Sequence, residues 1–451
     1  EAELMRLAFV AFAMFNRGRQ WVTEQELDHD LAALGVGPSR PGRTDGFRSP
    51  LTAGQEMVGR FFFIQRSQAV RDGRTLQTYE FLHATFGEYL VARLVVNVLQ
   101  DTAARASAGT LPLLAGTGDD QLLRSLLGYA PLVSRHTVLP FLGRRLDGPA
   151  GAPVRAWLMS ALRTALDRPQ YGELAYRPVE KPADEWMATY SLNLMLLALA
   201  CGGPVRASDV FPDADDPAAR MRRVAARWAA ATDGVTWGGM LDAMTIRHGW
   251  SGDRRDLVLE LGAGDAPDEV DPFWIFGRGP GADRPEPGVT VRYYTRQRHV
   301  SKSLQLTGAM GDDMTRHALE PLTGRAGESA TTFVVHPDGD VESIARSLLT
   351  VWTVSAGDGP GAALARAYRR AAFAVARSDP SDLTPNARLL LRLLAADAAR
   401  LPAGDVVFCL RTIVGSRFYD AALAPRVLEC LTAMPAVDDH AVREIEVRAH
   451  G

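Results

Sequence analysis

Two β-prone runs on either side of Asp72-Gly73 constrain the fold of this chain more than any other feature of its sequence. They form the stretch "FFFIQRSQAVRDGRTLQTYEFL", residues 61–82. Aspartate followed by glycine suits the positive backbone angles of a two-residue hairpin turn, and it is the strongest short-range signal for one. We therefore expect a β-hairpin here.

The residues before the hairpin predict helices. Near the N-terminus, apolar residues recur at helical spacing; they are Leu4, Leu7, Ala8, Ala11, Phe12 and Phe15. Further along, Thr23 and Glu26 have the spacing of a capping box. Val22 and Leu27 are placed as its hydrophobic staple, and Gly35 is expected to end this second helix.

A third helix is predicted over residues 51–60, after a loop rich in Gly, Pro, Ser and Arg at 36–50. Three helices followed by a hairpin are the layout of a winged helix. A closing helix is predicted over 85–99, with Thr85 and Glu88 as a second capping box. The residues expected on its buried stripe are Phe86, Tyr89, Leu90, Leu94 and Val98.

His83 stands just before this second capping box, in "YEFLHATFGEYL". The N-terminus of a helix presents unsatisfied N–H groups and a partial positive charge, so it favours an anion. A histidine at that junction can donate a hydrogen bond to a phosphate oxygen. From the residues alone, a half-buried structural histidine that bonds a hairpin carbonyl is the preferred interpretation.

The rest of the chain predicts a mainly α protein of 451 residues with three domains. We expect a winged-helix domain at 1–100, a helical domain at 101–217 and a C-terminal, mostly helical sensor or interaction domain at 218–451. A small second β-sheet is expected around 291–336. No self-similarity at the period of a known helical repeat stands out.

Composition narrows the function classes. A formal charge of −3 gives no general attraction to nucleic acid or membrane. The cysteines Cys201, Cys409 and Cys430 form no CxxC pair, which argues against a disulfide framework or zinc site and for a reducing cytoplasm. The longest apolar run, 194–201, is too short to span a bilayer. The first residues, "EAELMRLAF", lack a signal-peptide pattern and read as the inside of a helix, so we expect a fragment of a longer polypeptide.

Catalytic motifs are absent from the sequence. No GxxxxGK[ST] loop occurs, so the chain is not expected to hydrolyse ATP by that route. The stretch "GDGPGA", 357–362, has a GxGxxA outline, but a break between two helices is the better interpretation. There is no HExxH or GxSxG motif, and "DADDP" at 213–217 predicts a turn rather than a calcium site. We assign no catalytic and no metal-binding residue; an enzyme with its site within 226–350 is one alternative.

A DNA-binding transcription regulator with a helical effector domain is a second alternative. The predicted third helix offers Gln55 and Arg60, although Glu56 stands between them. The predicted wing carries basic residues that suit phosphate contact; they are Arg66, Arg71 and Arg74. A solvent-exposed wing explains these residues equally well.

A basic and aromatic run, "VRYYTRQRHV" at 291–300, is a candidate patch for an anionic ligand. Its basic residues are Arg292, Arg296 and Arg298. The same alternation fits the exposed face of a strand.

The stretch "YEFLHATFGEYLVARLV" resembles the end of the winged-helix domain of NACHT-type STAND NTPases. These signal-transduction ATPases include animal inflammasome receptors and bacterial antiphage sensors. The family pattern is F-x-H-x-x-[FW]-x-E-[FY]-[LF]-A-A, and the matching residues are Phe81, His83, Phe86, Glu88, Tyr89, Leu90 and Ala92. The chain departs from it at Gly87, where glutamine is common, and at Val91 to Arg93, which replace the usual Ala-Ala pair. The resemblance covers residues 1–100.

The resemblance implies that His83 contacts the β-phosphate of ADP and holds a closed, inactive state. It also implies that the chain is the regulatory, ligand- or partner-sensing C-terminal portion of a cytoplasmic ATP-binding signalling ATPase. The full-length protein would then be an ATPase that binds ADP or ATP with Mg, whereas this chain has no cofactor of its own. The implied partners are the ATPase domain of the same polypeptide and an unknown trigger, with oligomerisation on activation; membrane and nucleic acid are not expected.

Overall fold

The computed structural model forms two compact units, Glu1–Pro280 and Gly281–Gly451. The predicted domain boundaries at 100 and 217 both fall inside the first unit. The division of the chain into three functional domains stays a prediction. The structure describes residues 2–36, 64–71, 74–107, 120–148, 151–168, 175–262, 271–283, 285–292, 314, 317, 327–357, 361–435 and 439–450.

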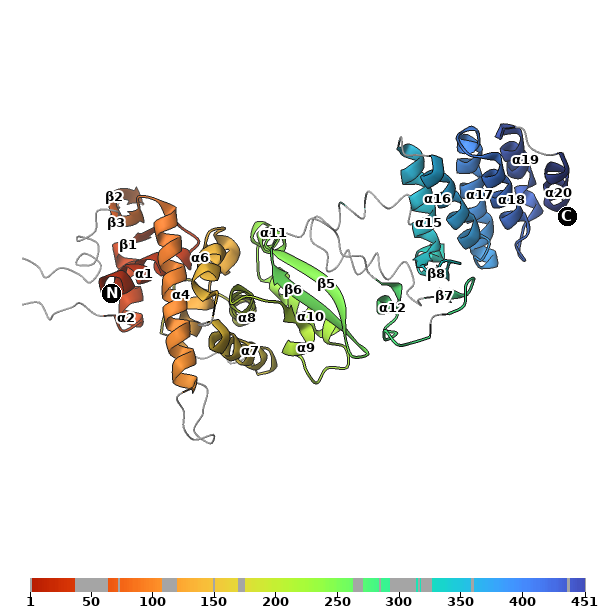
Figure 1. Ribbon diagram of the computed structural model, residues 1–451. Coiled ribbons are helices and arrows are strands. Elements are labelled where there is room, and N and C mark those ends of the chain that lie inside the picture. The colour runs from red at the N-terminus through yellow and green to blue at the C-terminus, as the bar shows by residue number, and fades with distance from the viewer. Residues whose placement is uncertain are drawn as a thin grey trace, which may run out of the picture. The chain divides into compact units, whose positions relative to one another are not determined.

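The first unit begins with two helices, a three-stranded sheet and the long helix α4 (Figure 1). This antiparallel sheet has the strand order β1-β3-β2. Arg71 pairs with Arg74, which leaves two residues between β2 and β3 and confirms the hairpin. Residues 51–60 and Asp72-Gly73 themselves lie outside the described residues. The elements are α1 (Ala2–Phe15), β1 (Trp21–Thr23), α2 (Glu24–Ala33), β2 (Ile64–Arg71), β3 (Arg74–Phe81) and α4 (Ala84–Ser107).

The predicted start and end of α2 are confirmed. The Thr23 hydroxyl accepts a hydrogen bond from the Glu26 amide at 3.2 Å, and the Glu26 carboxylate accepts one from the Thr23 amide at 2.9 Å. Val22 and Leu27 are fully buried, as a hydrophobic staple requires. Gly35 follows the helix with a φ of 71°, a conformation that favours glycine.

A helical region follows, and α4 packs against α1, α5, α6 and α7. Its helices are α5 (Gln121–Leu127), the 3₁₀ turn η1 (Leu132–Ser134), α6 (Val138–Leu146), α7 (Gly151–Asp167) and α8 (Ala183–Ala200). Helix α8 is buried on all sides, so the apolar run noted in the sequence belongs to the core. Gly128 ends α5 against the Trp186 ring, where an added Cβ would lie 2.0 Å from Nε1. Only glycine fits this contact.

Asn193 on α8 organises the segment after α5. Its side-chain amide donates to the carbonyls of Leu127 at 2.7 Å and Ala130 at 2.9 Å, and its oxygen accepts from the Leu132 amide at 2.8 Å. The side chain is fully buried, so it satisfies three backbone groups that water cannot reach.

A second sheet, which the sequence analysis did not predict, completes the first unit. Its strand order is β4-β6-β5, and the closing pair of its hairpin is Ser251 with Arg254. The Gly252-Asp253 step between these strands is the hairpin signal that was missed. Trp274 packs on this hairpin and donates its indole N–H to the Gly249 carbonyl at 2.8 Å. The elements are β4 (Val205–Arg206), α9 (Ala207–Val210), α10 (Pro217–Ala230), α11 (Gly234–Asp242), β5 (Met244–Ser251), β6 (Arg254–Leu261) and α12 (Pro272–Ile275).

The second unit contains a small sheet and a stack of helices (Figure 1). The sheet has the order β7-β8-β9, which confirms the second sheet expected around 291–336. Helix α16 packs against α18 and α17 against α19, so the helices form two layers. The break between α15 and α16 confirms the helix–loop–helix interpretation of 357–362. The elements are β7 (Thr290–Arg292), η2 (Gly327–Ala330), β8 (Thr332–Val335), β9 (Val341–Ser343), α15 (Ile344–Ala356), α16 (Gly361–Val375), α17 (Pro380–Asp397), η3 (Ala398–Arg400), α18 (Ala403–Val414), η4 (Ala421–Leu423), α19 (Ala424–Ala433) and α20 (Asp439–Ala449).

The fold class is therefore mainly α with small antiparallel sheets, as the sequence predicts. Among the helices that the structure describes, none is long and apolar enough to cross a membrane.

Replacing Asn193 by alanine is expected to destabilise the first unit by about 2–4 kcal/mol, because three buried backbone groups lose their partner. Thermal unfolding followed by tryptophan fluorescence measures this, since every tryptophan except Trp352 lies in the first unit. The matched control is Asn97→Ala on α4, which removes no described hydrogen bond. Equal stability of the two variants would contradict the role of Asn193.

Glu342 on β9 links the small sheet of the second unit to α15 and α16. Burial alone would raise the pKa of Glu342, but contact with His336, a hydrogen bond from Ser347 and the charge of Arg370 lower it to about 2. The His336 Nε2 atom lies 3.0 Å from the Glu342 carboxylate, outside the alignment of a regular hydrogen bond. The contact is therefore mainly electrostatic.

The folded-state pKa of Glu342 lies below its ordinary value of 4.5, so the ionised carboxylate stabilises the fold. This contribution, about 3 kcal/mol, is present above about pH 5 and is lost as the pH falls toward 2. We expect Glu342→Gln to flatten that pH dependence, as measured by hydrogen exchange over 332–356. The control is Glu429→Gln, at an exposed position on α19; a wild-type pH profile in the Glu342 variant would refute the assignment.

Candidate functional site

His83 lies in the two-residue connection between β3 and α4, and its side chain is exposed. The ring nitrogen Nδ1 contacts the Thr85 hydroxyl, and the Thr85 amide lies 3.4 Å from the same nitrogen. The His83 carbonyl accepts from the Phe86 amide at 3.1 Å. His83 therefore caps α4 itself. It does not bond a hairpin carbonyl among the described residues, and its Nε2 atom has no described hydrogen bond.

The predicted capping box of Thr85 and Glu88 is not formed. Helix α4 begins one residue earlier, at Ala84, because the His83 ring takes the position of the cap. The Glu88 carboxylate instead accepts a hydrogen bond from the hydroxyl of Thr137, just before α6. A long-range partner has replaced the local one.

The predicted buried stripe of α4 is right for three residues and wrong for two. Leu90, Leu94 and Val98 are buried, but Phe86 is 49% exposed and Tyr89 39% exposed. The reason is that all buried side chains of α4 lie between Leu90 and Ala103, so its first six residues project beyond the core.

These projecting residues form an exposed surface, which we call the α4 patch. It consists of Leu82, His83, Phe86 and Tyr89. Leu82 is 58% exposed, and Tyr89 keeps one edge-to-face contact with Phe141 at a ring distance of 5.7 Å. Large apolar side chains gathered on a surface are typical of a contact site for another protein or domain. The patch therefore places a histidine, a helix N-terminus and apolar anchors together.

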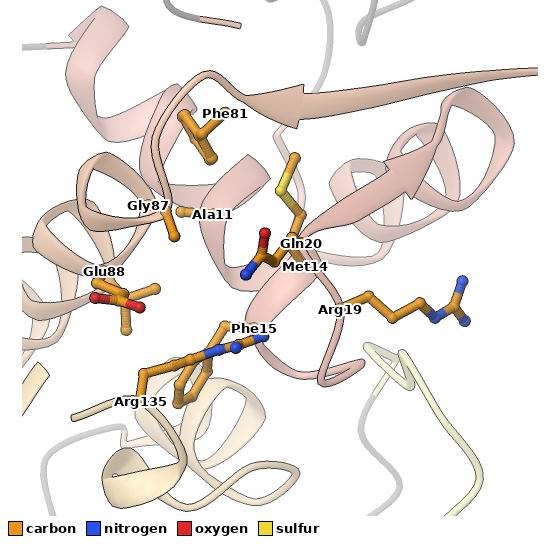
Figure 2. A pocket seen from close by; sticks show the side chains of 11 residues that line it. Ala11, Met14, Phe15, Arg19, Gln20, Phe81, Gly87, Glu88 and Arg135 are labelled. Carbon is orange, nitrogen blue, oxygen red and sulfur yellow. The ribbon is translucent and has the colours of Figure 1, made fainter. Parts of the chain in front are cut away.

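On another side of the same helix turns lies a hollow of about 410 Å³, a volume that includes the open space at its mouth (Figure 2). Its lining comes from α1, the turn after α1, the start of α4 and the segment before α6. Seven of its lining residues are apolar or glycine, and the other four are polar. The lining residues are Ala11, Met14, Phe15, Arg19, Gln20, Phe81, Ala84, Gly87, Glu88, Val91 and Arg135.

Gly87 lies against the Phe81 ring at the start of α4. A Cβ at this position would lie 3.1 Å from the Phe81 ring, tighter than ordinary contacts. The glycine thus lets Phe81 close over the start of α4 and leaves the wall of the hollow bare. The hollow brings together residues that are far apart in the sequence. Arg135 and Gln20 were not predicted as site residues, because no local pattern connects them to the motif.

The remaining predicted residues are only partly described. Arg292 lies at the end of β7, paired with Thr332, and nothing further of its side chain is described. Arg296 and Arg298 fall outside the described residues. Of the residues considered for DNA contact, Arg66 is exposed and lies 3.9 Å from Glu24. The side chains of Gln55, Glu56, Arg60, Arg71 and Arg74 are outside the described set.

The cysteines do not form a reactive site. Burial raises the pKa of Cys409 and of Cys430 to about 12, and that of Cys201 to about 11. Thiols of this kind stay protonated at neutral pH and are poor nucleophiles. In the part of the chain that the structure describes, no group of His, Cys, Asp and Glu side chains is arranged to hold a metal ion.

Comparisons with protein-family models, with curated proteins and with solved structures find no match to this chain.

The exposure of the α4 patch predicts that substitutions there affect stability less than substitutions further along the helix. We expect Phe86→Ser to change the free energy of unfolding by less than about 1 kcal/mol, as is usual for surface residues. Leu94 is buried in the core. Leu94→Ala is therefore expected to lower the free energy of unfolding by about 2–5 kcal/mol. Thermal unfolding of the two variants checks this, and a large loss for Phe86→Ser would show that the patch is part of the core.

Proposed function

We propose that this chain is the regulatory and sensing C-terminal portion of a NACHT-type STAND NTPase. In this proposal the α4 patch docks on an ATPase domain of the same polypeptide, and His83 contacts the β-phosphate of ADP bound there. The chain itself performs no catalysis. The proposal includes a cytoplasmic location and a trigger sensed by the helical regions that follow the winged helix.

The observation that carries the proposal is the exposure of the residues that match the family pattern. A helix with Phe86 and Tyr89 in its first turns would normally bury them, yet Phe86 is 49% and Tyr89 39% exposed beside His83. Large apolar side chains that are partly exposed next to a histidine fit a surface that is completed by another domain.

The local chemistry is suitable for a phosphate. The first N–H groups of α4 and the positive end of its dipole favour an anion near His83. Because Nδ1 of His83 is engaged by Thr85, the ring has Nε2 to offer outward. With Thr85 donating to Nδ1, Nε2 carries the ring proton of the neutral tautomer and can donate a hydrogen bond to a phosphate oxygen.

The proposed mechanism is a two-state switch. ADP bound between the ATPase domain and His83 stabilises the closed state, because only that state contains both halves of the contact. A trigger that displaces the winged helix removes the His83 contact and favours exchange of ADP for ATP. Oligomerisation with Mg-ATP bound would follow in the open state.

The test is His83→Ala in the full-length protein. We expect weaker retention of ADP through purification, by about 10-fold if one charge-assisted hydrogen bond is lost, and higher basal activity without trigger. Nucleotide content is measured by chromatography of the denatured protein, and ADP release by stopped-flow with a fluorescent analogue.

The matched control is His29→Ala, at an exposed histidine on α2 in the same winged helix. It is expected to retain ADP like the wild type. Unchanged ADP content and release in the His83 variant would overturn the assignment of His83, and a full-length sequence without an ATPase domain would overturn the proposal as a whole.

A further inference from the structure

The hollow beside α4 contains two opposite charges that do not pair with each other. The Glu88 carboxylate and the Arg135 guanidinium both line it and both are half-buried (Figure 2). No ion pair joins them. Their charges therefore face one space from two of its sides.

Neither charge is fully satisfied by the protein. Arg135 has a single described contact, a 3.5 Å approach to the Gly18 carbonyl, which is at the limit of a hydrogen bond. Glu88 accepts the Thr137 hydroxyl on Oε2, while Oε1 has no described partner. Both groups therefore keep hydrogen-bonding atoms that are available to a ligand.

The two other polar side chains of the hollow differ from each other. Arg19 is engaged within the protein, since its guanidinium lies 3.2 Å from Glu26 and 4.6 Å from the centre of the Trp21 ring. Gln20 is exposed, and its amide has no described hydrogen bond. Figure 2 shows this amide around the same space as the ends of Glu88 and Arg135.

We propose that the hollow binds a free apolar α-amino acid. Its ammonium group would be held by Glu88, its carboxylate by Arg135 with the Gln20 amide, and its side chain by the apolar wall. That wall consists of Ala11, Met14, Phe15, Phe81 and Val91.

The charges decide between ligand classes. A simple anion would be attracted by Arg135 but repelled by Glu88. A simple cation would be attracted by Glu88 but repelled by Arg135. A zwitterion satisfies both groups. The hollow is small and partly open to solvent, which favours a compact ligand over a nucleotide or a peptide.

This inference does not rest on the proposed function, because His83 is not part of the lining. A small ligand here would contact the start of α4 and the segment before α6 together, the two elements that the hydrogen bond between Thr137 and Glu88 joins.

The test uses the 451-residue chain with L-leucine, L-methionine and L-phenylalanine, each at up to about 10 mM. At about ten times the dissociation constant, a true ligand is expected to raise the melting temperature of the first unit by about 2–5 °C. Calorimetric titration gives the affinity. Two analogues of leucine control for charge: 4-methylpentanoate lacks the ammonium group and 3-methylbutylamine lacks the carboxylate, and both are expected to bind at least about 10-fold more weakly.

Glu88→Gln and Arg135→Gln test the residues. Each is expected to weaken binding of the preferred amino acid by about 10-fold or more, whereas Arg144→Gln, an exposed arginine on α6, is expected to leave it unchanged. Glutamine at 88 can still accept the Thr137 hydroxyl, so folding of this variant is checked by its melting temperature without ligand. No binding of any of the three amino acids, equal binding of 4-methylpentanoate, or wild-type affinity in both variants would overturn the proposal.

Discussion

The hydrogen bond from the Thr137 hydroxyl to the Glu88 carboxylate determines how the start of α4 is held. Its first turns extend beyond the core, since burial along the helix begins only at Leu90. The edge-to-face contact of Tyr89 with Phe141 adds a second link to the same neighbouring segment. These two contacts help to fix the direction of the projecting turns. The exposed α4 patch and the hollow both depend on that direction.

Local signals in the sequence were sufficient for much of the fold. The capping box of Thr23 and Glu26 and the two-residue hairpin are determined by neighbouring residues, so both were predicted correctly. The second capping box failed for the opposite reason, because Thr137, which lies 49 residues away, competes for Glu88. The sheet β4-β6-β5 was missed although its Gly252-Asp253 turn was visible. Its short strand β4 and the burial of β6 depend on helices from other parts of the chain.

The candidate sites show the same division. The sequence singles out His83 as a candidate because the motif is contiguous and precedes a helix, and its role stays a prediction. The exposure of Phe86 and Tyr89 could not be predicted, since an apolar stripe at helical spacing indicates a buried face and does not say where the core ends. The hollow was still harder to predict from the sequence, because Ala11, Glu88 and Arg135 come together only through the packing of α1, α4 and the segment before α6.

The arrangement has a thermodynamic consequence if both proposals hold. His83 precedes α4 and offers its ring outward, while Glu88 lies in the second turn and faces the hollow. A ligand in the hollow and a phosphate at His83 would then act on the same short piece of helix. Any effect of the first on the affinity of the second must be matched by an equal effect in reverse, because the coupling free energy belongs to both sites. The sign depends on which orientation of the projecting turns each ligand prefers: a shared preference strengthens both, and opposite preferences make the small ligand a trigger that releases the nucleotide.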